Sequence, residues 1–158
     1  MKIINHKVID QLSLEASESD RLRKNLNLHD DYADPCQRLF IAMEPGTYIR
    51  PHRHTDPPKP ECFMAVRGRF ALLVFENSGE VREVIPFGDG CETLAIDLPA
   101  GEWHSIIVLE SKSIFFETKP GPYVAMSDKD FAPWAPEENS PEVNQYLTTL
   151  KKVVSTRC

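Results

Sequence analysis

The sequence predicts an all-β fold, an antiparallel sandwich or barrel of which the jelly roll is the leading version, with a short helix near each end. After Pro35 the chain consists of short apolar runs, rich in β-branched and aromatic side chains, that are typical of strands. Turn-forming pieces, ENSG at 76–79 and ESKS at 110–113, separate some of these runs. No helical pattern lies between the runs, so the connections favour antiparallel pairing.

The elements follow in order along the chain. A helix is expected over residues 8–16, where apolar side chains recur at helical spacing, and residues 21–35 are polar and predict irregular chain. Strands are then expected over 37–43, 47–50, 61–67, 69–75, 81–85, 93–98, 104–109 and 113–118. A second helix is expected after Ser140 and Pro141, which are typical of an N-cap and a first helical position.

The 158 residues fit one domain with its own core. We expect residues 1–34 to form the N-terminal helix and polar segment, 35–119 the β-barrel, and 120–158 a C-terminal extension with a helix. The strand FALLVF (70–75) is apolar on both faces, so its outer face needs cover from the terminal segments or from a second subunit. A homodimer is therefore one expectation.

Composition argues against several classes of protein. A formal net charge of -6 gives no basic surface for nucleic acid. The four cysteines show no CxxC spacing, which argues against a zinc ribbon and against a dithiol redox site. The sequence has no apolar run long enough for a signal peptide or a membrane span, so a cytoplasmic protein without membrane insertion is expected. Neither a serine-hydrolase arrangement nor a glycine-rich phosphate loop is visible.

Two histidines spaced by two, His52 and His54, point to a metal site. On a strand such residues face the same side about 6.6 Å apart and can converge on one ion. An HxH alone is more often solvated or structural, so the prediction also depends on Glu61, after the bend TDPPKP, and on His104 in PAGEWH. Three imidazoles and a carboxylate suit zinc, iron, manganese, nickel or copper. Glu61 either contacts the ion or orients a histidine.

Strand alternation adds three candidates for binding a substrate. Tyr48 and Arg50 precede His52 in steps of two, and Arg67 shares parity with Glu61. A guanidinium beside a metal would suit a carboxylate or phosphate of a ligand. The competing interpretation places both arginines at strand ends in water. The polar pieces LRKNLN and KPGPY are expected to cap turns, to face solvent, or to help close the mouth of a cavity.

Two groups of residues resemble the characteristic motifs of the cupin superfamily. The first motif, glycine, HxH, glutamate and glycine, is matched by Gly46, His52, His54, Glu61 and Gly68. The second, PxGxxH, is matched by Pro99, Gly101 and His104. The loop between His54 and Glu61 is longer than usual, and Thr93 and Val108 stand where the second motif has glycine and asparagine.

Four longer stretches, LRKNLN, EPGTYIRPHRHTDPPKPE, PAGEWHS and KPGPYVAMSDKDFAPWAPEE, are similar to the WbuC-type cupin-fold metalloproteins, which are associated with surface-polysaccharide gene clusters of bacteria. The resemblance implies the cupin double-stranded β-helix, one divalent transition metal and a place in O-antigen or capsule biosynthesis. We therefore expect a metal-binding cupin that acts on or binds a small sugar-derived or anionic metabolite.

The type of chemistry stays open among three alternatives. A metal acting as a Lewis acid would suit an isomerase or epimerase. The same ligands would serve an Fe(II)-dependent oxygenase. A non-catalytic module that binds a sugar or nucleotide-sugar, with a structural metal, is the third alternative.

Overall fold

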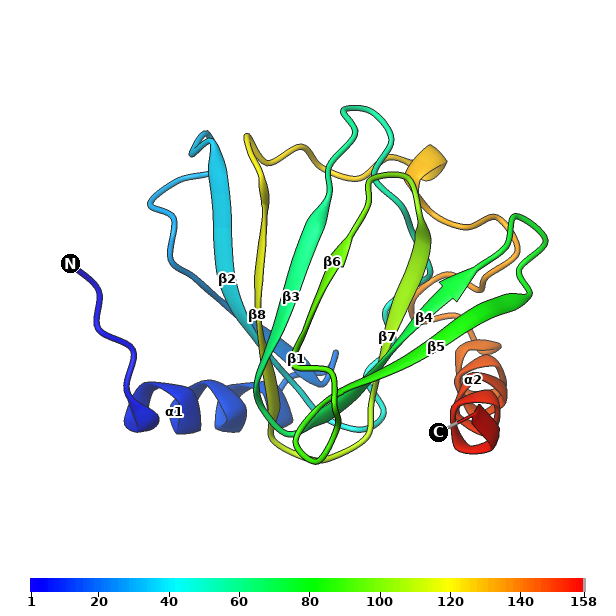
Figure 1. The fold of residues 1–158 in the computed structure, drawn as a ribbon, viewed down its shortest axis with the longest axis horizontal. Helices are drawn as coiled ribbons and strands as arrows, with labels where there is room; N and C mark the ends of the chain where they lie inside the picture. Colours follow the sequence, from blue (N-terminus) through cyan, green and yellow to red (C-terminus); the bar gives the residue numbers. More distant parts are fainter. Residues whose placement is uncertain (158) are drawn as a thin grey trace.

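The computed structural model describes residues 1–157. In these residues eight strands form two antiparallel sheets that face each other, with one long helix outside each sheet (Figure 1). The larger sheet has the order β1-β2-β8-β3-β6 and the smaller one the order β5-β4-β7. The expected all-β jelly-roll architecture with a helix near each end is confirmed.

The helices and strands have the following bounds: α1 His6–Ser17, β1 Arg23–Asn27, β2 Cys36–Met43, β3 Glu61–Arg67, β4 Arg69–Phe75, β5 Val81–Gly88, β6 Ala95–Leu98, β7 Trp103–Val108, β8 Ser113–Pro120, the short 3-10 helix η1 Asp128–Asp130, and α2 Val143–Arg157. Within this described part of the chain, no helix is long and apolar enough to cross a membrane.

Alternate side chains of the two sheets fill the space between them. In β4 the inward residues Phe70, Leu72 and Val74 are buried and pack with Phe63 of β3 and Phe115 of β8. This apolar core occupies the middle of the barrel. The inward positions at one end are polar instead, and strand register brings them together: β8 pairs Lys119 with Gln37 of β2, and Glu117 with Phe63 of β3, two residues after Glu61.

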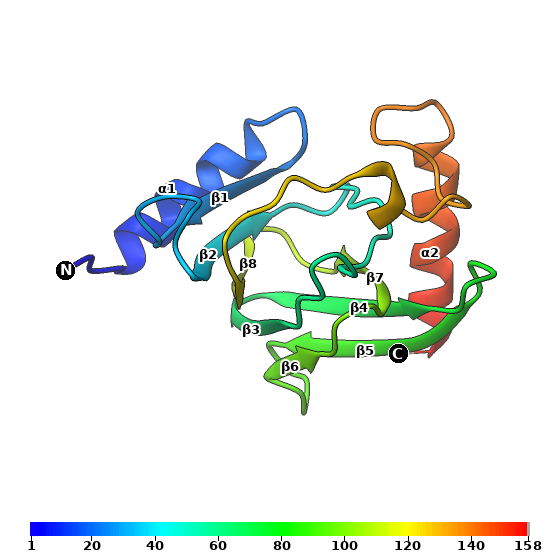
Figure 2. The ribbon, with the colours of Figure 1, turned by 90° about the horizontal axis from the view of Figure 1, so that it is seen from above.

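The outer face of β4 is covered by the chain's own C-terminal segment. Ala71, Leu73 and Phe75 pack against Leu147 and Leu150 of α2, which stands outside the three-stranded sheet (Figure 2). Of the two expected ways to cover the outer face of FALLVF, a terminal segment or a second subunit, the structure shows the terminal segment. The apolar outer face of β4 therefore no longer supports a homodimer, which stays a prediction.

Helix α1 covers part of the outer face of the five-stranded sheet. Ile9, Leu12 and Ala16 are buried against Ala42 of β2 and Ile114 of β8. Asn5 caps the helix, because its side-chain oxygen accepts a hydrogen bond from the Val8 amide at 3.2 Å. The helix expected over 8–16 is confirmed, with two more residues at its start.

Three local expectations were wrong. Residues 47–50 are not a strand: the Arg23 guanidinium, not a neighbouring strand, donates to the carbonyl of Tyr48 at 2.8 Å. Residues 21–35 are not all irregular, because β1 pairs with β2 along an edge that leaves its polar side chains in solvent. The second helix begins at Val143 rather than at Pro141, after a turn in which the Val143 amide donates to Ser140 O.

Candidate metal centre

The four predicted metal ligands lie at one end of the barrel. His52 forms an isolated antiparallel bridge with His104 of β7, in which each amide donates to the other's carbonyl, at 3.0 and 2.9 Å. This backbone pairing brings the two rings to 4.3 Å between centroids. Possible ligand atoms of His52, His54 and Glu61 lie within 4.8 Å of one another. Glu61, at the start of β3, also reaches His104, with 3.0 Å between Oε2 and Nε2.

Alternation separates the ligands from their neighbours, as strand geometry requires. Arg53, between the two histidines of the HxH, packs its guanidinium 4.1 Å over the ring of Trp103. Trp103 belongs to the cluster under α2, on the opposite face of β7 from His104. The imidazoles therefore face the barrel interior while Arg53 and Trp103 pack outside it.

Backbone carbonyls assign the tautomers of two histidines. Nδ1 of His52 lies 3.0 Å from Arg50 O, and Nδ1 of His104 lies 2.9 Å from Glu102 O. A carbonyl oxygen only accepts, so each Nδ1 carries the hydrogen, and in the neutral ring Nε2 is left with its lone pair. Metal-binding histidines are commonly oriented in this way, with the second nitrogen donating to a carbonyl.

The lone pair on His104 Nε2 faces another acceptor. Nε2 of His104 faces Oε2 of Glu61 at 3.0 Å, and two acceptors at this distance repel each other unless a proton or a metal cation lies between them. In the described part of the chain, His54 Nε2 and Glu61 Oε2 are buried without a hydrogen-bond partner. An unsatisfied buried polar group costs about 1–3 kcal/mol. A divalent cation between these atoms would satisfy them, so the residues present fit a metal.

Lys119 of β8 holds the other oxygen of Glu61. Its Nζ lies 2.8 Å from Glu61 Oε1 and 2.8 Å from Glu117 Oε1. The His54 Nε2 atom lies 3.3 Å from the same Glu61 oxygen. The carboxylate is therefore fixed from one side by an ammonium group, and its Oε2 atom is directed at His104.

The surrounding charges set the protonation states. Burial acts to raise the pKa of Glu61, while the Lys119 ammonium, 2.8 Å from Oε1, acts to lower it and favours the anionic carboxylate. Burial acts to lower the pKa of Lys119, but the carboxylates of Glu117 and Glu61 outweigh it and the net pKa is raised. Burial raises the pKa of Glu117 and, reinforced by neighbouring imidazoles, lowers that of His52. The site thus offers an anionic carboxylate and a neutral imidazole.

A small cavity opens beside His54. Its volume is about 90 Å³, and its lining includes His54, Lys59, Lys119 and Gln37. Residues 121–131, which follow β8, form one wall and cross this end of the barrel beside the 51–60 loop (Figure 2). We call residues 121–131 the roof. It is held by hydrogen bonds from the Tyr123 amide to Tyr32 O at 2.7 Å and from the Arg53 amide to Asp130 O at 2.9 Å.

The substrate candidates Tyr48 and Arg50 contact the C-terminal segment instead of the cavity. The Tyr48 hydroxyl donates to Pro136 O at 2.8 Å. The Arg50 guanidinium donates to Ala132 O at 3.2 Å and lies 5.2 Å from the centre of the Phe131 ring. Both side chains therefore fasten residues 131–136 to the barrel.

Arg67 lies on the outer face of the barrel. A β-bulge between Ala65 and Arg67 breaks the alternation that starts at Glu61, so the parity argument was wrong. The Arg67 guanidinium binds Asp10 of α1 at 2.7 Å and donates to Lys112 O at 2.9 Å.

Sequence reasoning missed the role of Lys119 and Glu117. KPGPY was expected to cap a turn, to face solvent or to help close the cavity, and only the pairing of β8 with β3 places Lys119 beside Glu61. The alternation of β8, with Phe115 buried inward, carried a signal: Glu117 and Lys119 share that face.

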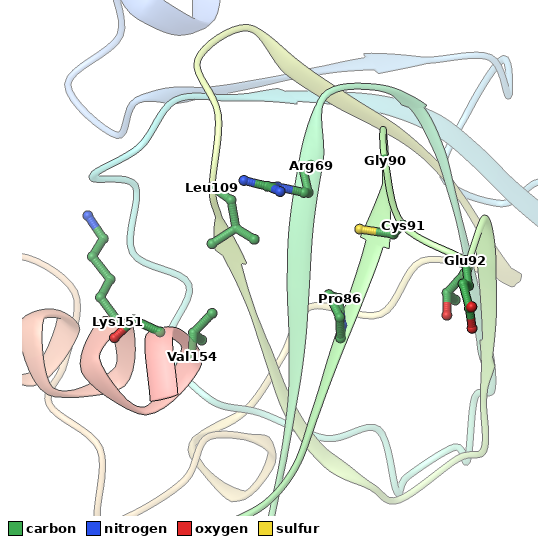
Figure 3. A pocket seen from close by; sticks show the side chains of 10 residues that line it. Arg69, Pro86, Gly90, Cys91, Glu92, Leu109, Lys151 and Val154 are labelled. Atoms are coloured by element: carbon green, nitrogen blue, oxygen red, sulfur yellow. The ribbon is translucent and has the colours of Figure 1, made fainter. Parts of the chain in front are cut away.

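A larger cavity of about 620 Å³ lies elsewhere, between α2 and the smaller sheet (Figure 3). Arg69 and Leu109 line one side and Lys151 and Val154 of α2 the other. None of the four predicted metal ligands lines this larger cavity, so it does not lead to the candidate metal centre.

Solved structures, two of them of proteins with a cupin-2 domain, share this fold. A cupin 2 domain-containing protein from Halorhodospira halophila is 16% identical, with a TM-score of 0.50 over 86% of this chain and 82% of that one. A cupin-2 domain-containing protein from Shewanella frigidimarina is 17% identical, with a TM-score of 0.50 over 75% and 95%. A conserved Streptococcus pyogenes protein of unknown function is 12% identical, with a TM-score of 0.51 over 78% and 90%. No curated protein matches the sequence.

The fold and the cluster together define a cupin-fold protein with a His/Glu site compatible with a divalent metal. Residues 4–86 match the family described as "Domain of unknown function (DUF6016)", and the chain belongs to that family. This description assigns no activity to the family.

Proposed function

We propose that His52, His54, Glu61 and His104 bind one divalent transition metal, and that the protein uses it to bind or transform a small anionic or sugar-derived molecule. One observation carries this proposal: His104 Nε2 and Glu61 Oε2 face each other at 3.0 Å, while Glu61 Oε2 and His54 Nε2 are buried without a hydrogen-bond partner among the described residues. Three imidazoles and one carboxylate suit zinc, iron, manganese, nickel or copper.

The chain's own residues supply the orientation. Two backbone carbonyls keep hydrogens on Nδ1 of His52 and His104, and Lys119 keeps the Glu61 carboxylate anionic and fixed. These residues would hold a divalent metal whose Lewis acidity would be available to polarise an oxygen of the bound molecule. The cavity beside His54 is the side from which such a molecule would approach.

The finer expectations rest on the resemblance of the sequence. The link to O-antigen or capsule biosynthesis and the sugar-derived ligand come from that resemblance, whereas the cytoplasmic location was expected from the lack of a long apolar run in the sequence; all three remain proposals. An Fe(II)-dependent oxygenase or a non-catalytic binding module would use the same four side chains, so the identity of the native metal is the first observation that separates them.

The experiment is metal analysis of the purified protein and of three variants. We expect about one divalent ion per chain in the wild type, and at least a tenfold loss of affinity in His54→Ala and His104→Ala, in line with the effect of removing groups at metal sites. His6→Ala is the matched control, because His6 is exposed at the start of α1. Equal metal content in all four proteins, or none in the wild type, would refute the proposal.

A further inference from the structure

We infer that Lys59 and Lys119 form an anion-binding pair at the open side of the metal centre. This rests on the proposed function and narrows the ligand to a class: a molecule whose terminal carboxylate or phosphate enters the cavity beside His54. Both lysines line that cavity together with His54, so one anionic group can meet an ammonium group and the metal at once.

Lys119 retains a donor for such a ligand. An ammonium group has three N–H donors, and two of them are directed to Glu61 and Glu117 at 2.8 Å. The Lys119 side chain is 21% exposed, and it borders the cavity. The third donor is therefore available on the cavity side of the centre.

Lys59 is buried with a neutral partner. The residue is 7% exposed, and its ammonium donates to Pro122 O in the roof. Among the side chains that the structure describes, no carboxylate lies within ion-pair distance of it. A buried charge without a counter-charge is costly, so an anionic ligand would be favoured here.

The size of the cavity limits what enters. Pockets that enclose drug-sized ligands measure about 300–1,000 Å³. A carboxylate or phosphate group fits, whereas a nucleotide-sugar is too large to be enclosed beneath the roof.

The two acidic residues that line the cavity, Asp130 and Asp56, do not neutralise the positive charge of the lysines. Asp130 Oδ2 accepts hydrogen bonds from the amide and the hydroxyl of Ser127, at 2.8 and 2.9 Å, and is thereby satisfied within its own turn. Asp56 is exposed to solvent, which screens its charge. Lys59 is buried, so its charge acts on the cavity with less screening, whereas Lys119 is paired with Glu61 and Glu117 and contributes its third N–H donor.

The test is calorimetric titration of the zinc-loaded protein with oxalate and, separately, with inorganic phosphate, with metal content measured on the same samples. Lys59→Gln is the decisive variant, because the hydrogen bond of Lys59 goes to Pro122 O and not to a proposed metal ligand; Lys119→Gln is the second. We expect both to weaken anion binding about tenfold or more, as for loss of a charge-assisted hydrogen bond, while Lys59→Gln keeps its zinc. Lys129→Gln, an exposed lysine of the roof, is the matched control and should bind as the wild type does.

The outcomes separate the two proposals. A zinc-loaded wild type that binds neither anion, or a Lys59→Gln variant with full zinc and unchanged affinity for both, overturns the anion site and leaves the metal site standing. A wild type that holds no zinc at His52, His54, Glu61 and His104 overturns both. Weakening for oxalate alone assigns the pair to carboxylates, and weakening for phosphate alone assigns it to phosphoryl groups.

Discussion

Replacing Glu61 by glutamine separates metal binding from folding. The amide is isosteric: its oxygen can still accept from Lys119, where the carboxylate oxygen lies at 2.8 Å, and its NH₂ can donate to His104 Nε2 across the present 3.0 Å. The change converts a contact between two acceptors into a hydrogen bond and removes the anionic ligand atom. We therefore expect Glu61→Gln to fold normally and to gain little thermal stability when metal is added.

The magnitudes follow from these contacts. The new bond to His104 stabilises the fold by about 0.5–1.5 kcal/mol, and weakening the charge-assisted bond from Lys119 costs a similar amount, so the metal-free stabilities should agree within about 1 kcal/mol. Metal at 100 times its dissociation constant stabilises the wild type by about 2.7 kcal/mol. For a chain of 158 residues this corresponds to a rise in Tm of about 5–11 °C.

The assay is thermal unfolding of both proteins, first after chelation and then with added zinc. We expect similar metal-free Tm values and a zinc-dependent rise in the wild type only. Glu61→Ala is the comparison, because it removes the ion pair with Lys119 and places no donor opposite His104 Nε2, so it should lower the metal-free Tm as well. An equal zinc-dependent rise in Glu61→Gln would refute direct contact between Glu61 and the metal.

Three further predictions concern the scaffold. Gly68→Ala should lower the free energy of unfolding in urea by about 2 kcal/mol or more, because Gly68 has φ +78° and a Cβ there would lie 2.8 Å from the Cβ of Ser113; Gly90→Ala, with φ +73° and open space, should cost only about 1–2 kcal/mol. Equal losses in both would show that the contact with Ser113 is unimportant. Leu150→Ala should cost about 2–5 kcal/mol by the same measurement, since Leu150 is buried between α2 and the smaller sheet, and a loss below about 1 kcal/mol would show that α2 contributes little. If the protein is a homodimer, sedimentation should show that Met64→Glu, on the outer face of β3 where Met64 is 46% exposed, weakens it; a monomeric wild type would make the dimer prediction wrong.

The parts of the fold that form short continuous apolar runs could be predicted from the sequence. In β4 the residues Phe70, Leu72 and Val74 face the core and their neighbours face α2, and the predicted bounds 69–75 match the structure. Edge strand β1 was missed, because LRKNLN carries polar side chains that the solvent-facing edge tolerates. Its strand character depends on pairing with β2, which no local pattern reveals.

The same distinction applies to the candidate site. His52, His54, Glu61 and His104 were predicted by spacing and resemblance, and the structure brings them together. The charged neighbours were not predicted: a bulge turned Arg67 away, and the partner of Glu61 is a lysine on a strand distant in sequence. The alternation of side chains along one strand does not show which strands are neighbours in the sheet, so the contact between Lys119 and Glu61 could not be predicted from it.

The central claim is that a metal ion lies between His104 and Glu61. Anomalous diffraction from crystals of the protein with its native metal, measured at the absorption edge of that metal, tests this most directly. The account predicts one strong peak about 2.0–2.2 Å from Glu61 Oε2 and from Nε2 of His104, with His52 and His54 completing the set. A peak only at surface carboxylates, or the absence of a peak between His104 and Glu61, would contradict it.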